Sequence, residues 1–176
     1  MRILQVISSF PPAYTYGGAA KVAYGVSKEL VKKGYEVTVY TTDVYDAYSR
    51  FKYDINPMWM DEIEVYHFKN LSNRFARKNL AAAPMMALAL SKNIENFDIV
   101  HLHEHRSFQA TLVHHYAKRY GVPYIVQPHG SLPRIVEKKG LKQLYDLVWG
   151  YKILRDAKAI IALTSFEAEQ DRKSVV

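Results

Sequence analysis

Short apolar runs and longer amphipathic stretches alternate along the whole of this chain. Six runs rich in β-branched and aromatic residues predict strands over residues 2–8, 35–42, 63–68, 98–103, 122–127 and 159–163. Stretches with helical periodicity lie between them, over residues 19–33, 80–96, 107–120 and 141–156. Strands that alternate with helices predict an α/β fold in which a doubly wound parallel sheet of about six strands has helices on both faces.

Three of these helical stretches carry an apolar stripe that we expect to face the sheet. The stripes comprise Val22, Val26 and Leu30 in the first helix, Phe108, Leu112, Tyr116 and Tyr120 in the third, and Leu144, Leu147, Val148, Tyr151 and Leu154 in the fourth. Gly34 and Gly121 follow the first and third helices, and glycine commonly ends a helix. Pro84 fits the second helix only if that helix begins close to it.

Two regions depart from this regular alternation. Residues 43–62 are rich in aromatic side chains and long for a loop in a compact domain, so we expect them to be functional or mobile. Thr164 and Glu167 form a capping box for a last helix, but the chain ends at Val176 with nothing to pack behind it. We therefore expect residues 1–176 to be one domain of a longer protein, with its last helix cut short.

Composition narrows the class of protein. The chain has 176 residues, 49% of them hydrophobic and 23% charged, which suits one soluble globular domain. It has no cysteine, which excludes disulfides and thiolate sites. The start of the chain carries no export signal, and its longest nearly apolar run, residues 80–90, is shorter than the roughly 20 residues of a bilayer span. We expect a cytoplasmic protein.

The formal net charge of +7 is unevenly distributed. One basic cluster comprises Lys69, Arg74, Arg77 and Lys78, and a second comprises Arg134, Lys138, Lys139 and Lys142. Such clusters attract the phosphates of nucleotides, lipid head groups or nucleic acid, although solvated surface faces are the plainer interpretation. Phe75 lies within the first cluster, so contact with an anionic membrane is an alternative to a helix that simply packs on the sheet.

Candidate site residues lie where the predicted strands end. His129 and Gly130 directly follow the strand at 122–127, and open α/β sheets bind ligands at the carboxyl ends of their strands. Gly17 and Gly18 precede the first helix, where backbone amides without obstructing side chains form an anion site. A flexible turn is the alternative reading of this glycine pair, because neither a dinucleotide fingerprint nor a Walker loop is present.

Three alternate histidines, His101, His103 and His105, form another candidate. Alternate residues of a strand share one face, so three imidazoles there have the spacing of a zinc site, as in a metal hydrolase. A strand that leaves its sheet near His103 would instead separate them and bring His103 and Glu104 to the crevice. Thr164 and Ser165 arrive at the same edge, where helix capping alone explains them and ligand contact would be additional.

These motifs, in this order, resemble the amino-terminal half of family-4 (group 1) retaining glycosyltransferases. The first part of the chain is similar to the start of that family in four segments. They are Arg2-Ile-Leu-Gln-Val-Ile-Ser-Ser9, Pro11-Pro12, Gly17-Gly18 and Glu29-Leu-Val-Lys-Lys-Gly-Tyr-Glu-Val-Thr-Val39. The fourth strand of that family resembles Asp98-Ile-Val-His-Leu-His103, and its His-Gly loop resembles Pro128-His-Gly-Ser-Leu-Pro133. Its sixth strand with the following cap resembles Ala162-Leu-Thr-Ser-Phe-Glu-Ala-Glu169. The resemblance covers essentially the whole chain.

The resemblance implies one Rossmann-like half of a two-domain GT-B enzyme. A donor-binding domain would follow Val176, and without it this part would be inactive alone. Gly17, Gly18 and Gly130 would bind the diphosphate of a nucleotide-sugar donor, and His129 would act beside the reaction centre. His103 and Glu104 would lie on the acceptor side, and Thr164 and Ser165 would line the cleft.

The same resemblance implies the partners of the protein. The parent enzyme would transfer a hexosyl or other glycosyl group to a saccharide or lipid-linked acceptor with retention, in polysaccharide biosynthesis. No metal, other cofactor or nucleic acid is expected. It would work in the cytoplasm, with peripheral contact to the inner membrane face as an option. The alternatives are a non-catalytic sugar- or nucleotide-binding module and a GT-B sugar-nucleotide epimerase.

Overall fold

A parallel sheet forms the centre of the molecule in this computed structural model, which describes residues 1–13, 17–46, 48–52, 55–72, 81–130 and 139–163. Within these residues the sheet has seven strands in the order β3-β4-β2-β1-β5-β6-β7. The strands are β1 (Arg2–Val6), β2 (Glu36–Thr42), β3 (Met58–Met60), β4 (Ile63–Phe68), β5 (Ile99–His103), β6 (Tyr124–Gln127) and β7 (Ala159–Ile160). Only β3 and β4 pair antiparallel. The predicted α/β fold is confirmed.

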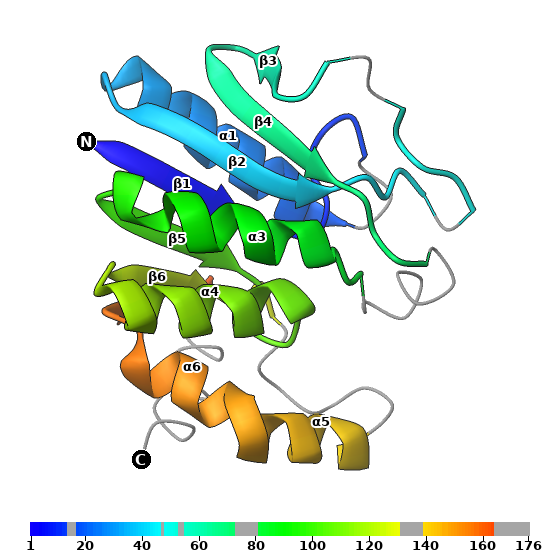
Figure 1. Ribbon diagram of the computed structural model, residues 1–176, viewed down its shortest axis with the longest axis vertical. Coiled ribbons are helices and arrows are strands. Elements are labelled where there is room, and N and C mark those ends of the chain that lie inside the picture. Colours follow the sequence, from blue (N-terminus) through cyan, green and yellow to red (C-terminus); the bar gives the residue numbers. More distant parts are fainter. Residues whose placement is uncertain (14–16, 47, 53–54, 73–80, 131–138, 164–176) are drawn as a thin grey trace.

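Helices cover both faces of the sheet (Figure 1). Helix α1 (Gly18–Lys32) lies on one face, and α3 (Pro84–Asn93) and α4 (Phe108–Tyr120) lie on the other. A 3-10 turn, η1 (Ile94–Asn96), follows α3. The last helical segment runs through α5 (Lys139–Tyr145), the π-helical turn η2 (Asp146–Gly150) and α6 (Tyr151–Asp156), and α6 lies beside α4.

The alternation of side chains along β1 divides the core in two. Leu4 and Val6 pack in the larger cluster with the apolar side chains of α3, α4 and α6. Ile7 packs on the opposite face with Ala23 of α1. Burying a side chain of this size stabilises the fold by about 1.5–3 kcal/mol. Gln5, a polar residue on the same face as Ile7, is fully buried at the centre of the sheet.

The sheet differs from the prediction at its two edges. Strand β3 was not predicted and lies within residues 43–62, where it pairs with β4 as an antiparallel edge strand. A three-residue strand is too short to show a period in the sequence. At the other edge, β7 has two residues rather than the predicted five at 159–163, and it pairs with β6 alone.

Two helices bury other residues, several of them small, in place of their predicted apolar stripes. In α1 the buried residues are Ala20, Ala23 and Ser27, and the predicted stripe is half-buried beside them. In α4 they are Gln109, Ala110, Val113 and Ala117, with the predicted aromatic stripe at the margin of the core. Small side chains let each helix lie close to the sheet, so the larger ones pack around its sides.

The predicted inward face of the fourth helix is wrong at four of its five positions, and only Leu154 is buried as predicted. Leu144, Leu147, Val148 and Tyr151 are exposed, whereas Asp146, Gly150, Ile153 and Leu154 are buried. The π-helical turn at Asp146–Gly150 inserts an extra residue per turn, which rotates the two ends of the segment relative to each other. A prediction that assumes one helical period over residues 141–156 therefore places most of the apolar side chains on the wrong side of the helix.

The predicted helix ends agree with the structure. Pro84 is in the first turn of α3, and Gly121 ends α4 in the left-handed conformation with φ of 72°.

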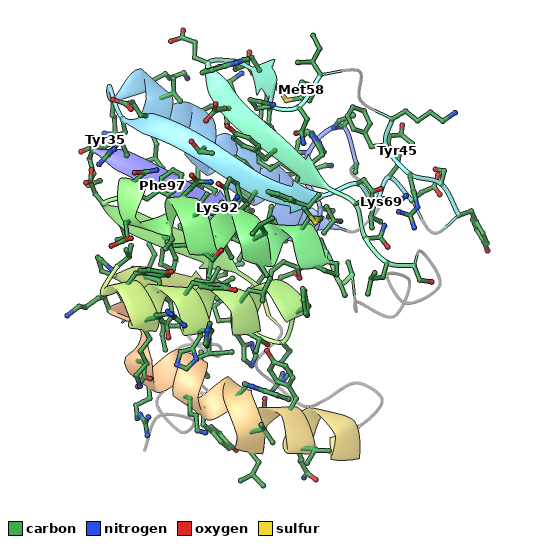
Figure 2. The ribbon with its side chains drawn as sticks, in the orientation of Figure 1. Tyr35, Tyr45, Met58, Lys69, Lys92 and Phe97 are labelled. Carbon is green, nitrogen blue, oxygen red and sulfur yellow. The ribbon has the colours of Figure 1, made fainter. Side chains whose placement is uncertain are left out.

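Beyond β2 and β4, Asp43 joins two connecting segments, because it accepts hydrogen bonds from the Asn70 amide at 2.8 Å and from Arg50 Nη1 at 3.0 Å. Figure 2 shows Tyr45 and Lys69 at this same end of the sheet.

Candidate active site

The strand order reverses between β1 and β5. From β1 the chain moves outward through β2 and β4, and later places β5, β6 and β7 on the other side of β1. Ligands of open parallel sheets bind at such a reversal, in the crevice beyond the carboxyl ends of the strands. Strands β1, β5 and β6 end at this edge with Val6, His103 and Gln127. The segments that follow these residues form the candidate site.

The paired glycines lie at the N-terminus of α1. Gly17 is the N-cap, with φ of 101° in a region that favours glycine, and Gly18 is the first helical residue. Both are exposed, and a Cβ atom built on either would meet nothing within 4 Å. Among the described residues, which exclude 14–16, no side chain caps this helix end by a hydrogen bond. The amides of the first turn are thus open to an anionic group.

His129 and Gly130 form a turn directly after β6. Both have left-handed backbone conformations, with φ of 54° and 75°. This conformation is costly for a residue with a side chain, by roughly 1–3 kcal/mol, and such residues cluster at functional sites. The side chain of His129 is half-buried, and its Nε2 lies 2.8 Å from His103 Nδ1. The two rings are stacked, with centroids 5.1 Å apart.

His103 is more deeply buried than His129. It is fully buried, and its Nε2 lies 2.6 Å from Gln5 Oε1 on the neighbouring strand β1. Burial lowers the pKa of His103 well below its usual value, and His101 and His129 lower it further because a second positive charge nearby is unfavourable. His103 is therefore neutral near pH 7, and it contacts other side chains rather than the exposed crevice.

Glu104 is the first residue after β5, at the edge where the strand order reverses, and it has a left-handed φ of 71°. Its carboxylate Oε2 accepts a hydrogen bond from Ser8 Oγ at 2.7 Å, which joins the segments that follow β1 and β5. Its backbone amide donates to Gln127 O at 2.9 Å. Burial raises the pKa of Glu104, and the Ser8 hydroxyl opposes this shift. This half-buried carboxylate is the acidic group of the candidate site.

Gln5 and Ser8 were not predicted as site residues. Their partners, His103 and Glu104, lie about a hundred residues away in the chain, at separations of 98 and 96. One local signal does exist for Gln5, because it is a polar residue in the middle of an apolar strand. A buried amide usually has a hydrogen-bond partner, so that position points to a polar neighbour without identifying it.

The three alternate histidines do not converge. His101 and His103 lie on one face of β5, with their rings tilted by 30° and the ring centroids 4.1 Å apart. His105 lies past the strand end, and its Nε2 is 3.9 Å from Asp146 Oδ1 of η2. Burial lowers the pKa of His101 to about 4 and that of His105 to about 3. No group of three His, Asp or Glu side chains in the described part of the chain is arranged to hold a metal ion.

The order of motifs and the geometry of the strand ends agree with a comparison against known families. Residues 16–174 match the family described as Glycosyltransferase Family 4. The chain belongs to Glycosyltransferase Family 4. The matched range includes both glycines at the start of α1, the segment after β5 and the His129–Gly130 turn. The family resemblance drawn from the motifs is thereby confirmed.

Solved structures confirm the fold of this Family 4 domain. Anabaena Alr3699/HepE in complex with UDP and glucose is similar with a TM-score of 0.62 at 16% identity, over 99% of this chain and 41% of that one. Its structure with UDP gives a TM-score of 0.63 at 17% identity, over the same shares of 99% and 41%. The fold is Rossmann-like, of the GT-B class. The chain thus spans less than half the length of HepE.

The curated proteins include no significant match to this chain. In the part that the structure describes, no helix has both the length and the apolar character needed to cross a bilayer. Thr164, Ser165 and the basic residues 74–78 and 134–138 lie outside the described residues, as do the side chains of Lys139 and Lys142. The roles predicted for them stay predictions.

Proposed function

We propose that this domain forms the acceptor side of a retaining glycosyltransferase. The parent enzyme would take a hexosyl or other glycosyl group from a nucleotide-diphosphate sugar and transfer it to a saccharide or lipid-linked acceptor. Membership of Family 4 supports the reaction class, and the UDP and glucose bound by HepE are consistent with such a donor. Polysaccharide biosynthesis in the cytoplasm is the process in which such an enzyme would act.

One observation carries the proposal. Ser8, Glu104 and His129 come from the segments after β1, β5 and β6, and His103 is the last residue of β5. Hydrogen bonds join Ser8 to Glu104 and His103 to His129 at the strand reversal. Loops assembled in this way form a rigid rim for a ligand. A purely structural role explains a buried histidine, but it does not explain a left-handed, half-buried His129 at this edge.

The residues of the rim have roles suited to the charges that develop during transfer. As the bond from the sugar to the diphosphate breaks, positive charge develops on the sugar and negative charge on the departing diphosphate. The amides of Gly17, Gly18 and Gly130 would meet the phosphate oxygens, as fixed dipoles that need no reorganisation. His129 would hydrogen-bond the donor sugar, and Glu104 would lie toward the acceptor.

The remaining parts of the reaction lie beyond these residues. A second domain would supply most of the donor site, and we expect this chain alone to be inactive. Diphosphate stabilisation would come from amide dipoles and basic side chains, so we expect transfer without a metal ion. Retained activity after exhaustive dialysis against EDTA would agree with this expectation, and activity restored only by a divalent cation would contradict it.

Replacing His129 tests the proposal. In the complete protein, His129→Ala should lower the turnover of a nucleotide sugar by about 10- to 1000-fold, because a positioned hydrogen-bonding group is lost in the transition state. His115→Ala is the matched control, since His115 is an exposed histidine on α4. Initial rates of radiolabelled sugar transfer are the measurement. Equal rates for both variants would defeat the role assigned to His129.

Two alternatives predict different products. A sugar-nucleotide epimerase would convert the donor sugar with no acceptor present, which chromatography of the nucleotide sugars would reveal. A non-catalytic binding module would bind nucleotide sugars or oligosaccharides in calorimetry and leave both unchanged. Transfer to an added acceptor, with release of the nucleoside diphosphate, is expected only for the glycosyltransferase.

Peripheral membrane contact is a separate part of the proposal. The described residues on either side of 73–80 expose large apolar side chains, with Leu71 68% exposed, Met85 57% and Leu88 46%. Apolar side chains next to basic residues bind anionic membrane surfaces. We expect co-sedimentation with anionic vesicles at low salt and weaker binding at high salt. The absence of binding to anionic vesicles at low salt would remove this idea.

A further inference from the structure

A polar groove lies at the opposite edge of the sheet from the candidate active site, at the amino ends of β1, β2 and β4. Its volume is about 280 Å³, near that of a small-ligand pocket. The three strands form one wall, and the end of α3 with the residues that follow it forms the other. On this side, no helix of the described residues covers the amino ends of β2 and β4 (Figure 1).

The strand register fixes a carboxylate inside the groove. Thr38 is opposite Glu64, and Tyr40 is opposite Tyr66, in the parallel pairing of β2 and β4. Glu64 accepts hydrogen bonds from Thr38 Oγ1 on its Oε2 and from Tyr66 Oη on its Oε1, both at 3.1 Å. Because each carboxylate oxygen has two lone pairs, Glu64 can accept further hydrogen bonds from a ligand. This acceptor is therefore held in place before any ligand arrives.

Aromatic rings form the apolar part of the groove. Tyr40 contacts the rings of Tyr66 and Phe97 edge to face, with centroids 5.4 and 6.3 Å apart, and Phe97 lies between β2 and α3 (Figure 2). Trp59 of β3 is opposite Glu64 in the antiparallel pairing, so it lies on this same face, and it is 65% exposed. Tyrosine and tryptophan are enriched at binding interfaces, because their rings combine apolar faces with one polar group.

The charges of the groove select a class of ligand. Arg2, Glu36 and Asn96 are exposed at its margin, so donors and acceptors of both signs surround the aromatic rings. Sugar hydroxyls donate and accept hydrogen bonds, and the C–H faces of sugar rings stack on aromatic faces. Glu36 and Glu64 would repel a phosphate, whereas Arg2 would oppose a cation. A neutral saccharide is the ligand that this mixture fits.

Aromatic side chains of β4 lead from the groove toward the candidate active site. Phe68, the last residue of β4, stacks with Tyr66 at a centroid distance of 6.4 Å, and both rings are half-buried. A strand of this length spans roughly 20 Å. We propose that the groove is a second saccharide site, which binds sugar units of a long acceptor at a distance from its reacting end. Only the naming of the acceptor rests on the proposed function.

Saccharide binding can be measured without any donor sugar. Neutral hexasaccharides of glucose, mannose, galactose or N-acetylglucosamine are the probes, each added separately to ¹⁵N-labelled protein. We expect at least one of them to shift the amide signals of Thr38, Glu64 and Asn96. The absence of a shift at these residues with all four probes at about 10 mM would overturn the proposal. Shifts there with spermidine or inorganic phosphate, but with no hexasaccharide, would also overturn it.

Two variants with matched controls test the walls of the groove. Trp59→Ala should weaken the binding of the hexasaccharide by about tenfold, and Trp149→Ala should not change it. Trp149 is the other tryptophan of the chain, 44% exposed on η2. Asn96→Ala should weaken binding by about three- to tenfold, and Glu95→Ala, at the adjacent exposed residue, should not. Equal affinities within both pairs would overturn the site.

The role in acceptor binding has its own measurement in the complete protein. Trp59→Ala should raise the ratio of KM for a hexasaccharide acceptor to KM for a disaccharide acceptor by about 3- to 10-fold, because only the longer chain gains from a second contact. His129→Ala should lower turnover with both acceptors, so the two proposals fail separately. Hexasaccharide binding with an unchanged KM ratio would overturn the acceptor role and leave the saccharide site standing.

Discussion

Asp146 is a buried carboxylate that joins the candidate site to the last helical segment. Its two oxygens accept hydrogen bonds from Arg106 Nε and Nη2, both at 2.8 Å. A bidentate pair of this kind offsets the desolvation of both charges through short, well-aligned bonds. Arg106 follows Glu104 by two residues, so the pair fixes the segment after β5 against η2. The position of Glu104 thus depends on a residue outside the rim.

Gly150→Ala should destabilise the protein through this carboxylate. A Cβ atom on Gly150 would lie 2.6 Å from Asp146 Oδ1, and Arg106 prevents that oxygen from moving away freely. We expect a loss of about 1–3 kcal/mol in unfolding free energy, although alanine is the better helix former. Gly25→Ala is the control, because Gly25 lies within α1 and its Cβ would meet nothing within 4 Å.

Urea denaturation compares the unfolding free energies of the two alanine variants. Gly25→Ala should be neutral or stabilising by up to about 1 kcal/mol, from helix propensity alone. If Gly150→Ala were equally stabilising, the carboxylate would not be held where the structure places it. Near-UV circular dichroism of Trp149, which directly precedes Gly150, would report local rearrangement.

At the level of elements, β6 holds α6 by a buried hydrogen bond. Tyr124 Oη donates to Ile153 O at 2.6 Å, and burial raises the pKa of this phenol. Ile153 lies in the last turn of α6, where carbonyl groups lack partners within the helix. Asp156 adds an outer link, because it accepts hydrogen bonds from His114 and Lys118 of α4 at 3.0 and 2.8 Å. These contacts set how α6 lies against the sheet.

Tyr124→Phe should therefore weaken the attachment of α6. Removing the hydroxyl leaves a buried carbonyl without its donor, which costs about 1–3 kcal/mol in unfolding free energy. Tyr120→Phe is the matched control on α4, where the tyrosine ring is half-buried against the core cluster and its hydroxyl has no partner among the described residues. Equal stability of the two variants in guanidinium denaturation would contradict the capping role of Tyr124.

Across the whole molecule, buried histidines make stability depend on pH. Burial lowers the pKa of His67 to about 4, that of His101 to about 4 and that of His105 to about 3, in three separate places. The unfolded chain, with histidine pKa values near 6.5, takes up protons first as the pH falls. Their contribution to stability is complete above pH 6.5 and is lost progressively toward pH 4.

This loss should be measurable in urea at pH 7.5 and pH 5. At about 1.4 kcal/mol per pKa unit, each of these histidines should cost about 2 kcal/mol by pH 5. His101→Phe should reduce the pH dependence by one histidine, and His115→Phe, at an exposed position, should leave it unchanged. Stability that does not change between the two pH values would contradict the burial of neutral rings.

The local pattern of the chain predicted six of the seven described strands, most helix ends and the edge at which we place the candidate site. Apolar runs, Pro84 and Gly121 act through neighbours in sequence, so residues 2–8 or 107–120 are readable without a fold. His129 and Glu104 could be proposed for the same reason, because each lies within two residues of a strand end. Family membership then followed from the order of such motifs.

Only the tertiary structure decided which faces are buried and which side chains meet. The π-helical turn at Asp146–Gly150 moved the inward face of the last segment, and the buried residues of α1 and α4 differ from their predicted stripes. Gln5 and His103 are 98 residues apart and become neighbours only because β1 and β5 pair. Strand order depends on the packing of the whole sheet, so contacts across it have no signal in any short stretch of sequence.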